Sequence, residues 1–170
     1  ATLGYSDGTY YYTPDNWYNE AFHNSFRQEY NLSISGAKDR LTYYGSAGYL
    51  GDGGIVNNSG YKRYTARVNV DFQAREWLKV STNLSYVHSD SQTASYTDSY
   101  GSSGNIFYIA NMIGPIYPLY VRDADGNIMM ENGMKVYDSN QTGFVRPSFV
   151  GNAVRDNEVN RRHTNADVVT

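Results

Sequence analysis

Cysteine is absent from the 170 residues, and proline occurs only four times. Without cysteine the chain can form neither a disulfide framework nor a thiolate metal site. Leucine, isoleucine, valine and phenylalanine are sparse, so little aliphatic material is available for a water-excluding core. No apolar run approaches the roughly 18 residues that a membrane-spanning helix needs. If this chain crosses a membrane, it does so as strands.

An excess of basic residues is also missing. The formal net charge is -3 at pH 7, and the isoelectric point is about 5.5. Such a chain has no general attraction for nucleic acid, and the basic trio at 161–163 is too small to change this. We therefore expect no nucleic-acid partner.

Tyrosine and glycine are abundant instead, with 18 and 16 copies. Residues 27–88 predict four antiparallel strands, at 27–35, 41–50, 61–73 and 77–88. The third is the clearest, because apolar and polar side chains alternate along its whole length. Its apolar face holds Tyr64, Ala66, Val68, Val70 and Phe72. The first and fourth strands alternate in the same way, with Tyr30, Leu32 and Ile34 in one and Leu78, Val80, Leu84 and Tyr86 in the other.

Connection lengths indicate how these strands are joined. The segments 36–40 and 74–76 are short, whereas 51–60 is longer and rich in glycine and asparagine, which we expect to supply turn positions with positive φ. Residues 89–160 show no sustained alternation and predict one long loop, which can hold a hairpin at 123–126. Short turns that alternate with long loops are typical of outer-membrane barrels.

The two ends of the chain have weaker patterns. Residues 1–26 predict an aromatic-rich loop with a short helix after Pro14, capped by Asp15 or Asn16. Residues 161–170 predict the start of a further strand.

Three motifs suggest chemistry but have simpler interpretations. Gly4–Gly8 matches the G-x-S-x-G pattern of hydrolases, with His163 as a nominal partner, yet the following Thr9–Pro14 is a poor helix opening where that fold needs a helix. The aspartates of residues 123–126 resemble a calcium loop, but the glycine is too early and the terminal glutamate is missing. No histidine has a second one three or four residues away. We therefore expect plain turns at Gly4–Gly8 and at 123–126, and no metal, no cofactor and no enzymatic activity.

Aromatic clusters in the long loop are the candidates for ligand binding. Rings of this kind stack on sugar faces while their hydroxyl groups reach polar atoms. Packing of the loop on itself or on a partner protein is the principal alternative. The candidate residues are Phe107, Tyr108, Tyr117 and Tyr120.

Six segments, in order along the chain, resemble one known family, the SusC/RagA-type TonB-dependent outer-membrane transporters. Three of them look like a hairpin of the transporter barrel: Gly48–Leu50, Asp52–Val56 and Tyr61–Asn69. The others are Asn16–Tyr18, Phe26–Gly36 and Pro115–Tyr120, the last followed by Asp123–Asn127. No counterpart of the family's plug domain, TonB box or signal peptide is identified among these residues.

The resemblance implies an all-β fold, with antiparallel strands forming part of a large transmembrane β-barrel and one long extracellular loop. It implies import of large nutrients, chiefly oligosaccharides and in some cases peptides, across the Gram-negative outer membrane. Its implied partners are a SusD-like surface lipoprotein that acts as a lid, the TonB complex, and outer-membrane lipid.

A secreted all-β carbohydrate-binding or adhesion module is the alternative. In a barrel the apolar strand faces meet lipid, whereas in a sandwich they meet a second sheet.

Overall fold

The computed structural model describes residues 4–94, 105–139 and 151–170. These residues form two compact units. The sheet unit comprises Asn24–Thr93 and Arg162–Thr170, and the loop unit comprises Ala1–His23 and Ala94–Arg161. The elements in chain order are β1 (Tyr5–Ser6), β2 (Tyr11–Tyr12), α1 (Trp17–Ala21), β3 (Arg27–Lys38), β4 (Leu41–Gly53), β5 (Gly60–Arg75), β6 (Leu78–Ala94), α2 (Ile106–Met112), β7 (Met130–Glu131), β8 (Met134–Lys135), α3 (Ala153–Val159) and β9 (Arg161–Val169).

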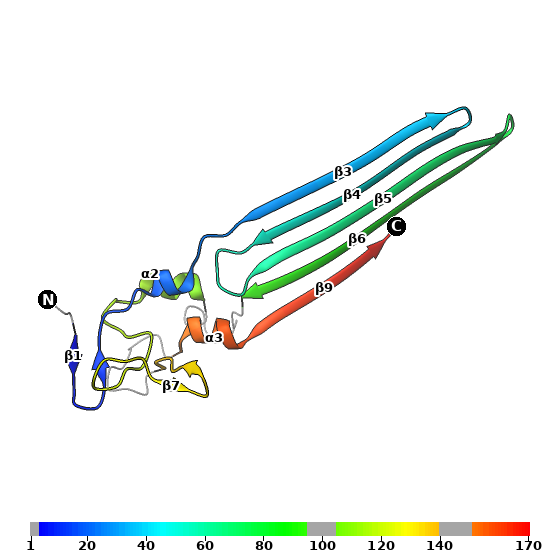
Figure 1. The fold of residues 1–170 in the computed structure, drawn as a ribbon. Coiled ribbons are helices and arrows are strands. Elements are labelled where there is room, and N and C mark those ends of the chain that lie inside the picture. Colours follow the sequence, from blue (N-terminus) through cyan, green and yellow to red (C-terminus); the bar gives the residue numbers. More distant parts are fainter. Residues whose placement is uncertain (1–3, 95–104, 140–150) are drawn as a thin grey trace. The chain divides into compact units, whose positions relative to one another are not determined.

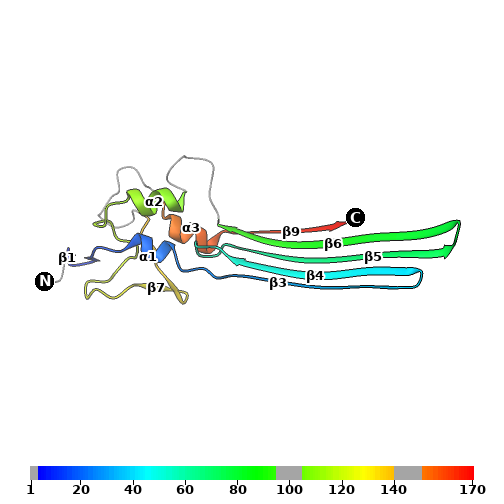
Figure 2. The same ribbon diagram turned by 90° about the horizontal axis from the view of Figure 1, so that it is seen from above.

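The sheet unit is one five-stranded sheet with the order β3-β4-β5-β6-β9. Its strands lie side by side in one layer (Figures 1 and 2). The first three pairings are antiparallel. Ser85 of β6 and Thr170, next to the end of β9, exchange both backbone hydrogen bonds, at 2.8 and 3.0 Å, which is the antiparallel pattern. Strands β3 and β9 are the edges, so the described residues form an open sheet.

The pairing register aligns the apolar residues of four strands. Ile34 lies opposite Gly45, Gly45 opposite Val68, and Val68 opposite Leu84. Since side chains directly opposite one another share a face of the sheet, the alternating residues of all four strands point to the same side. The predicted all-β, antiparallel architecture is confirmed.

Two short connections and one longer one join the four strands. Asp39 and Arg40 link β3 to β4, with Asp39 at a φ of 52°. Glu76 and Trp77 link β5 to β6, next to a register shift between Gln73 and Arg75. The longer connection, residues 54–59, takes its positive φ from Asn58 and not from a glycine. An asparagine thus supplies the positive φ, as the glycine- and asparagine-rich composition predicts, whereas three of the four glycines lie inside strands.

The strands run beyond the predicted bounds. Strand β3 reaches Lys38 and β6 reaches Ala94, where the sequence predicted ends at residues 35 and 88. The added part of β6 is polar, but Gln92 pairs with Gly60 and Asp90 with Lys62 on β5. Backbone pairing extends these strands where the side-chain pattern has stopped.

The loop unit combines short elements from both ends of its sequence. Each helix starts at an asparagine whose side-chain oxygen accepts a backbone N–H of the first turn, namely Asn16, Asn105 and Asn152. Segment 89–160, predicted as one long loop, holds the end of β6, both of the later helices and the β7–β8 hairpin. Within the described ranges no helix is long and apolar enough to cross a membrane.

Candidate functional site

The two faces of the sheet differ in chemistry. We call the face that carries Ile34, Val68 and Leu84 the apolar face, and the opposite one the polar face. Leu32 on the apolar face is 76% exposed and Ile34 is 65% exposed, although both are aliphatic. The other large exposed side chains on this face are Tyr30, Leu41, Tyr43, Tyr64, Val68, Phe72, Leu78, Val80, Leu84 and Tyr86. A contiguous exposed patch of this kind needs an apolar environment to cover it.

Three ion pairs between exposed side chains lie on the polar face. Arg27 lies 3.7 Å from Glu29 and 3.8 Å from Asp52, and Lys79 lies 3.4 Å from Asp71. All of these groups are well exposed, so each pair contributes little to stability. Their arrangement indicates that the polar face meets water.

A row of aromatic rings crosses the apolar face. Tyr30, Tyr49, Tyr64 and His88 lie opposite one another on β3 to β6, with ring centroids 6.3, 5.1 and 6.1 Å apart. We call this the tyrosine row. From Tyr64 to Phe72, β5 has the length of about 9–11 residues that a tilted strand needs to cross a bilayer.

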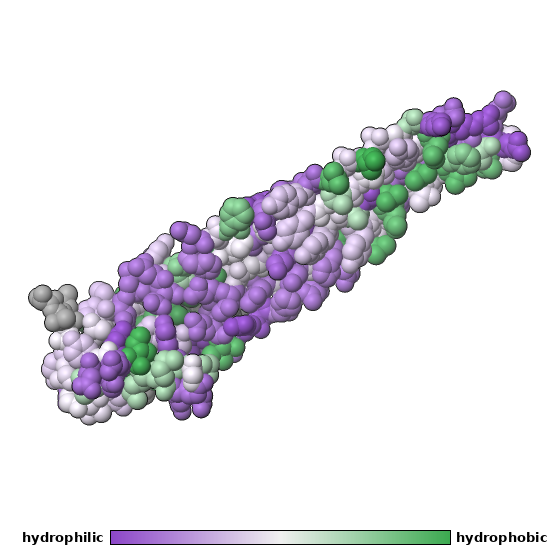
Figure 3. Space-filling view, viewed as in Figure 1, coloured by the Kyte–Doolittle hydropathy of each residue, from purple (hydrophilic) through white to green (hydrophobic). Residues whose placement is uncertain are grey.

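The band of apolar side chains stops short of both ends of the strands. In Figure 3 hydrophobic residues gather over the half of the sheet nearer the β3–β4 and β5–β6 turns, while the turns themselves are hydrophilic. Trp77 in the second turn is 81% exposed. Aromatic residues at the two borders of an apolar band are characteristic of membrane barrels.

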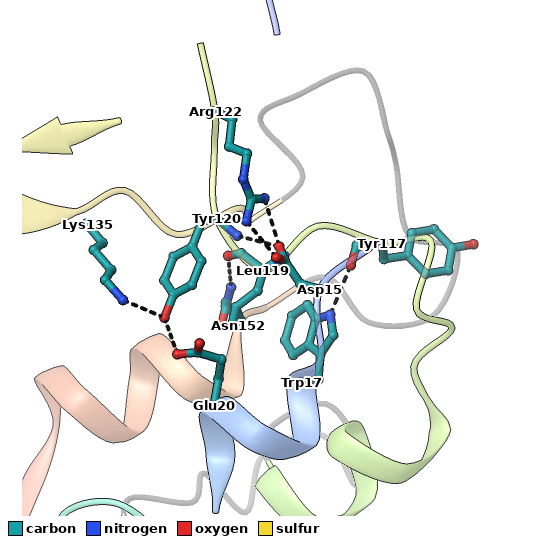
Figure 4. A network of polar contacts seen from close by, with 9 residues as sticks. All are labelled: Asp15, Trp17, Glu20, Tyr117, Leu119, Tyr120, Arg122, Lys135 and Asn152. Carbon is teal, nitrogen blue, oxygen red and sulfur yellow. Dashed lines mark hydrogen bonds and ion pairs between the residues drawn. The ribbon is translucent and has the colours of Figure 1, made fainter. Parts of the chain in front are cut away.

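An ion pair lies at the centre of the loop unit (Figure 4). The Arg122 guanidinium donates to both carboxylate oxygens of Asp15, at 2.6 and 3.0 Å, and each side chain is only 11% exposed. The Asp15 carboxylate also accepts the backbone N–H of Leu119 at 2.7 Å. Asp15 therefore connects the N-terminal segment to residues 119–122.

Trp17 and Tyr120 make further links between these segments (Figure 4). The Trp17 indole N–H donates to the Tyr117 carbonyl at 2.9 Å. The Tyr120 hydroxyl donates to Glu20 at 2.7 Å, and Lys135 Nζ lies 3.3 Å from that hydroxyl and 4.5 Å from the ring centroid. Burial, together with the hydrogen bond to Glu20, raises the pKa of Tyr120 above its ordinary value.

Asn152 holds the start of α3 against the same segment. Its side-chain N–H donates to the carbonyls of Leu119 and Asp138, at 3.1 and 2.9 Å, while its oxygen accepts the Arg155 N–H. Leu119 is fully buried, and Asn152 is 1% exposed. The loop unit thus has a core of its own, built from polar contacts and a few apolar side chains.

The four aromatic candidates have different surroundings. Tyr120 is only 4% exposed, so in this conformation its ring cannot stack on a ligand. The Tyr117 side chain points away from the polar network in Figure 4. Phe107 packs on Phe22 with ring centroids 5.2 Å apart, yet it stays 49% exposed, and its neighbour Tyr108 is 41% exposed. Ligand binding remains a prediction for Phe107 and Tyr108, whereas the contacts of Tyr120 give it a packing role.

The other motifs have structural roles. Ser6 lies in the β1–β2 hairpin, where its hydroxyl accepts the Gly8 N–H at 3.2 Å, and the strand that follows is not the helix of a nucleophile elbow. One oxygen of Asp123 accepts the backbone N–H groups of Asp125 and Asn127, which closes a tight turn and lowers the Asp123 pKa. Among the described residues no cluster of histidine and acidic groups can hold a metal ion.

Neither the tyrosine row nor the Asp15–Arg122 pair is predicted by the sequence analysis. The row depends on the register of four strands, although tyrosines at similar positions in successive strands are a usable signal. The ion pair joins residues 107 apart in the sequence, and no local pattern links them.

Comparison with family models gives no match. Curated proteins do match. A TonB-dependent receptor of Formosa agariphila is 32% identical over 97 residues, which cover 57% of this chain and 9% of that receptor. The TonB-dependent receptor SusC of Bacteroides thetaiotaomicron is 28% identical over 134 residues, which cover 78% of this chain and 12% of SusC. The chain therefore spans only a small part of the length of these relatives.

Solved structures give a similar result. The RagAB peptide importer in its closed-closed state matches with a TM-score of 0.54 and 26% identity, over 73% of this chain and 14% of the importer chain. A second structure, of the RagAB peptide transporter, matches with a TM-score of 0.55 and 25% identity over the same shares.

Proposed function

Because the chain is similar to TonB-dependent receptors of the SusC/RagA type, we propose that it forms part of the wall of an outer-membrane importer. The importer lies in the outer membrane of a Gram-negative cell and takes up large nutrients. Oligosaccharides are the principal class that we propose. The TonB complex supplies the energy, and a SusD-like surface lipoprotein covers the external opening.

The contrast between the two faces of the sheet carries this proposal. The apolar face exposes aliphatic side chains such as Leu32 and Ile34, and the polar face carries ion pairs such as Lys79–Asp71. In an antiparallel membrane barrel the outward residues meet lipid and the inward ones meet a polar interior. A soluble carbohydrate-binding module would need a second sheet over the apolar face.

Connection lengths give the orientation across the membrane. The two-residue turns at Asp39–Arg40 and Glu76–Trp77 lie at one end of the sheet. The β4–β5 connection and the segment between β6 and β9 start from the other end. Since short turns of such barrels are periplasmic and long loops are extracellular, we assign the loop unit to the cell surface.

The loop unit then supplies residues for contacts with nutrient or lid. Phe107 and Tyr108 are two of its exposed aromatic residues. Exposed rings on a positioned loop suit sugars, because a ring stacks on the C–H face of a pyranose. We propose these two residues, and not the buried Tyr120, as its first contact candidates.

Growth experiments test the transport function. Cells that lack the full-length receptor would be supplied with a single oligosaccharide mixture as the carbon source, with simple sugars as the control. We expect growth on simple sugars only, with restoration by the receptor gene and none in a strain that lacks TonB. Growth on the oligosaccharides without the receptor would contradict the proposal.

Peptides are the second substrate class, and one observation favours them. The two solved structures described above are of RagAB, a peptide importer or transporter by its description. Supplying the same strains with a peptide digest as the nitrogen source separates the classes. Loss of growth on peptides alone would assign the receptor to peptide uptake.

A further inference from the structure

A hollow of about 400 Å³ lies on the sheet next to the tyrosine row. Its lining includes three glycines of β4 and β5, namely Gly51, Gly53 and Gly60, and the Tyr49 side chain lies over the first of them. We call it the glycine hollow. The residues that matter for its chemistry are Gln28, Tyr49, Gly60, Lys62, Asp90 and His163.

The register places this hollow on the apolar face, beyond the hydrophobic band. Gln28, Lys62 and Asp90 form the next row after the tyrosine row on the same face, on the side away from the short turns. Polar side chains replace aliphatic ones at this row. The hollow therefore lies where an outward face leaves hydrocarbon and meets the headgroup layer.

The walls combine aromatic and hydrogen-bonding groups. Phe26 and Tyr49 supply rings, and Gln28 supplies an amide. Asp90 lies 3.0 Å from His163 Nε2, which holds its carboxylate in place. Lys62 also lines the hollow, and its ammonium group carries three hydrogen-bond donors. A shallow site with rings, an amide, a carboxylate and an ammonium group suits a sugar, which presents both C–H faces and hydroxyl groups.

The side of the wall identifies the source of that sugar. A nutrient in transit passes along the polar interior, whereas this hollow opens on the lipid-facing side. A sugar that reaches it is carried by a membrane lipid. We propose that the glycine hollow binds a sugar residue in the headgroup of an outer-leaflet glycolipid such as lipopolysaccharide. This proposal depends on the proposed function only in taking the apolar face to meet lipid.

Filling the hollow is the direct test. Gly60 does not have a positive φ, and a Cβ atom there would lie 3.5 Å from the Asp52 carbonyl oxygen, which is ordinary van der Waals contact. Gly60→Val should therefore fill the floor without strain. Asp90→Asn removes the charge and keeps the shape. Gly45→Val is the matched control, because Gly45 faces the same side within the hydrophobic band, where an added Cβ atom would lie 3.6 Å from Ile34 Cγ2.

The full-length receptor would be reconstituted in nanodiscs with purified lipopolysaccharide, and bound glycolipid would be counted by native mass spectrometry. We expect the wild type and Gly45→Val to retain it and the two hollow variants to retain about tenfold less, as for the loss of hydrogen bonds to a charged group. Phosphatidylethanolamine, which lacks sugar, should bind all four proteins equally.

Two results would overturn the proposal. Equal retention of lipopolysaccharide by all four proteins would show that the hollow binds no sugar. Binding of the deacylated, water-soluble saccharide as tightly as lipopolysaccharide would show that its ligand is not a membrane lipid. Failure of the proposed function can be distinguished from failure of the glycolipid proposal, because all four proteins would then be missing from the outer-membrane fraction.

Discussion

Asp15 and Arg122 form a two-point ion pair between segments 107 residues apart in the sequence, with the shorter N–O distance at 2.6 Å. Asp15 also accepts the Leu119 N–H. The pair is nearly buried, so loss of one partner leaves the other charge without compensation.

Arg122→Ala should destabilise the loop unit by about 3–5 kcal/mol, the usual cost of breaking a buried pair. Hydrogen exchange in the full-length receptor would report this as faster exchange of the backbone amides around Leu119. Arg155→Ala is the control, because Arg155 is 53% exposed and 3.9 Å from Asp156. Its effect should stay within about 0.5 kcal/mol. Similar effects of the two variants would mean that the Asp15–Arg122 pair does not stabilise the unit.

Alkaline pH should weaken the same unit. The folded-state pKa of Tyr120 is raised, so the folded protein keeps this proton while the unfolded chain loses it above its ordinary value of 10.0. Stability from this group is therefore complete below pH 10 and declines as the pH rises above it. Tyr137, whose pKa is also raised by burial and Glu158, contributes with the same sign.

Tyr120→Phe should reduce this alkaline decline, since phenylalanine has no proton to lose. Cleavage of the loop unit by an alkaline-active protease between pH 8 and 11 measures it. Tyr5→Phe, at a residue that is 63% exposed, is the control and should follow the wild type. A Tyr120→Phe profile as steep as that of the wild type would contradict the assignment.

A new positive charge should reduce barrel assembly at one residue of β3 but not at its neighbour. Ile34→Arg places a cation on the apolar face, where it costs about 2–4 kcal/mol at the bilayer midplane, and Ser33→Arg places it on the polar face at little cost. The amount of heat-modifiable barrel in outer membranes should fall for Ile34→Arg only. Equal losses, or the reverse order, would mean that the register relative to the membrane is shifted by one residue.

Removal of the loop should separate assembly from transport. In a receptor in which residues 102–157 are replaced by a short Gly/Ser linker, all five strands of the sheet remain. Because no ladder hydrogen bond of the sheet is lost, we expect normal barrel assembly with reduced uptake or lid binding. Assembly is read from heat-modifiable electrophoresis and uptake from growth. If assembly fails, residues of this segment contribute to the wall.

Strands with regular alternation were predictable from the sequence, and the rest was not. Leu32, Ile34, Val68 and Val70 alternate with polar residues, so their common face follows from a period of two. The last residues of β6 have no such pattern and are strand because β5 pairs with them.

The fold of the loop unit could not be predicted from the sequence for a related physical reason. Its helices are short, so no helical periodicity can develop in them. Its stability depends on single distant contacts, such as those of Asp15 and Asn152, which leave no periodic signal. The sequence predicts Asp15 or Asn16 as the helix cap; in the structure Asn16 caps α1, and Asp15 pairs with Arg122.

Spin labelling along β5 tests the central claim, that the sheet is a barrel wall with its apolar face toward lipid. This chain has no cysteine, so single cysteines introduced at residues 65–70 of the full-length receptor provide unique sites once any cysteine elsewhere is removed. Accessibility to oxygen, which concentrates in lipid, should peak at Ala66, Val68 and Val70, and accessibility to a water-soluble nickel complex should peak at Thr65, Arg67 and Asn69. A reversed alternation, or accessibility to nickel without a period of two, would contradict the account.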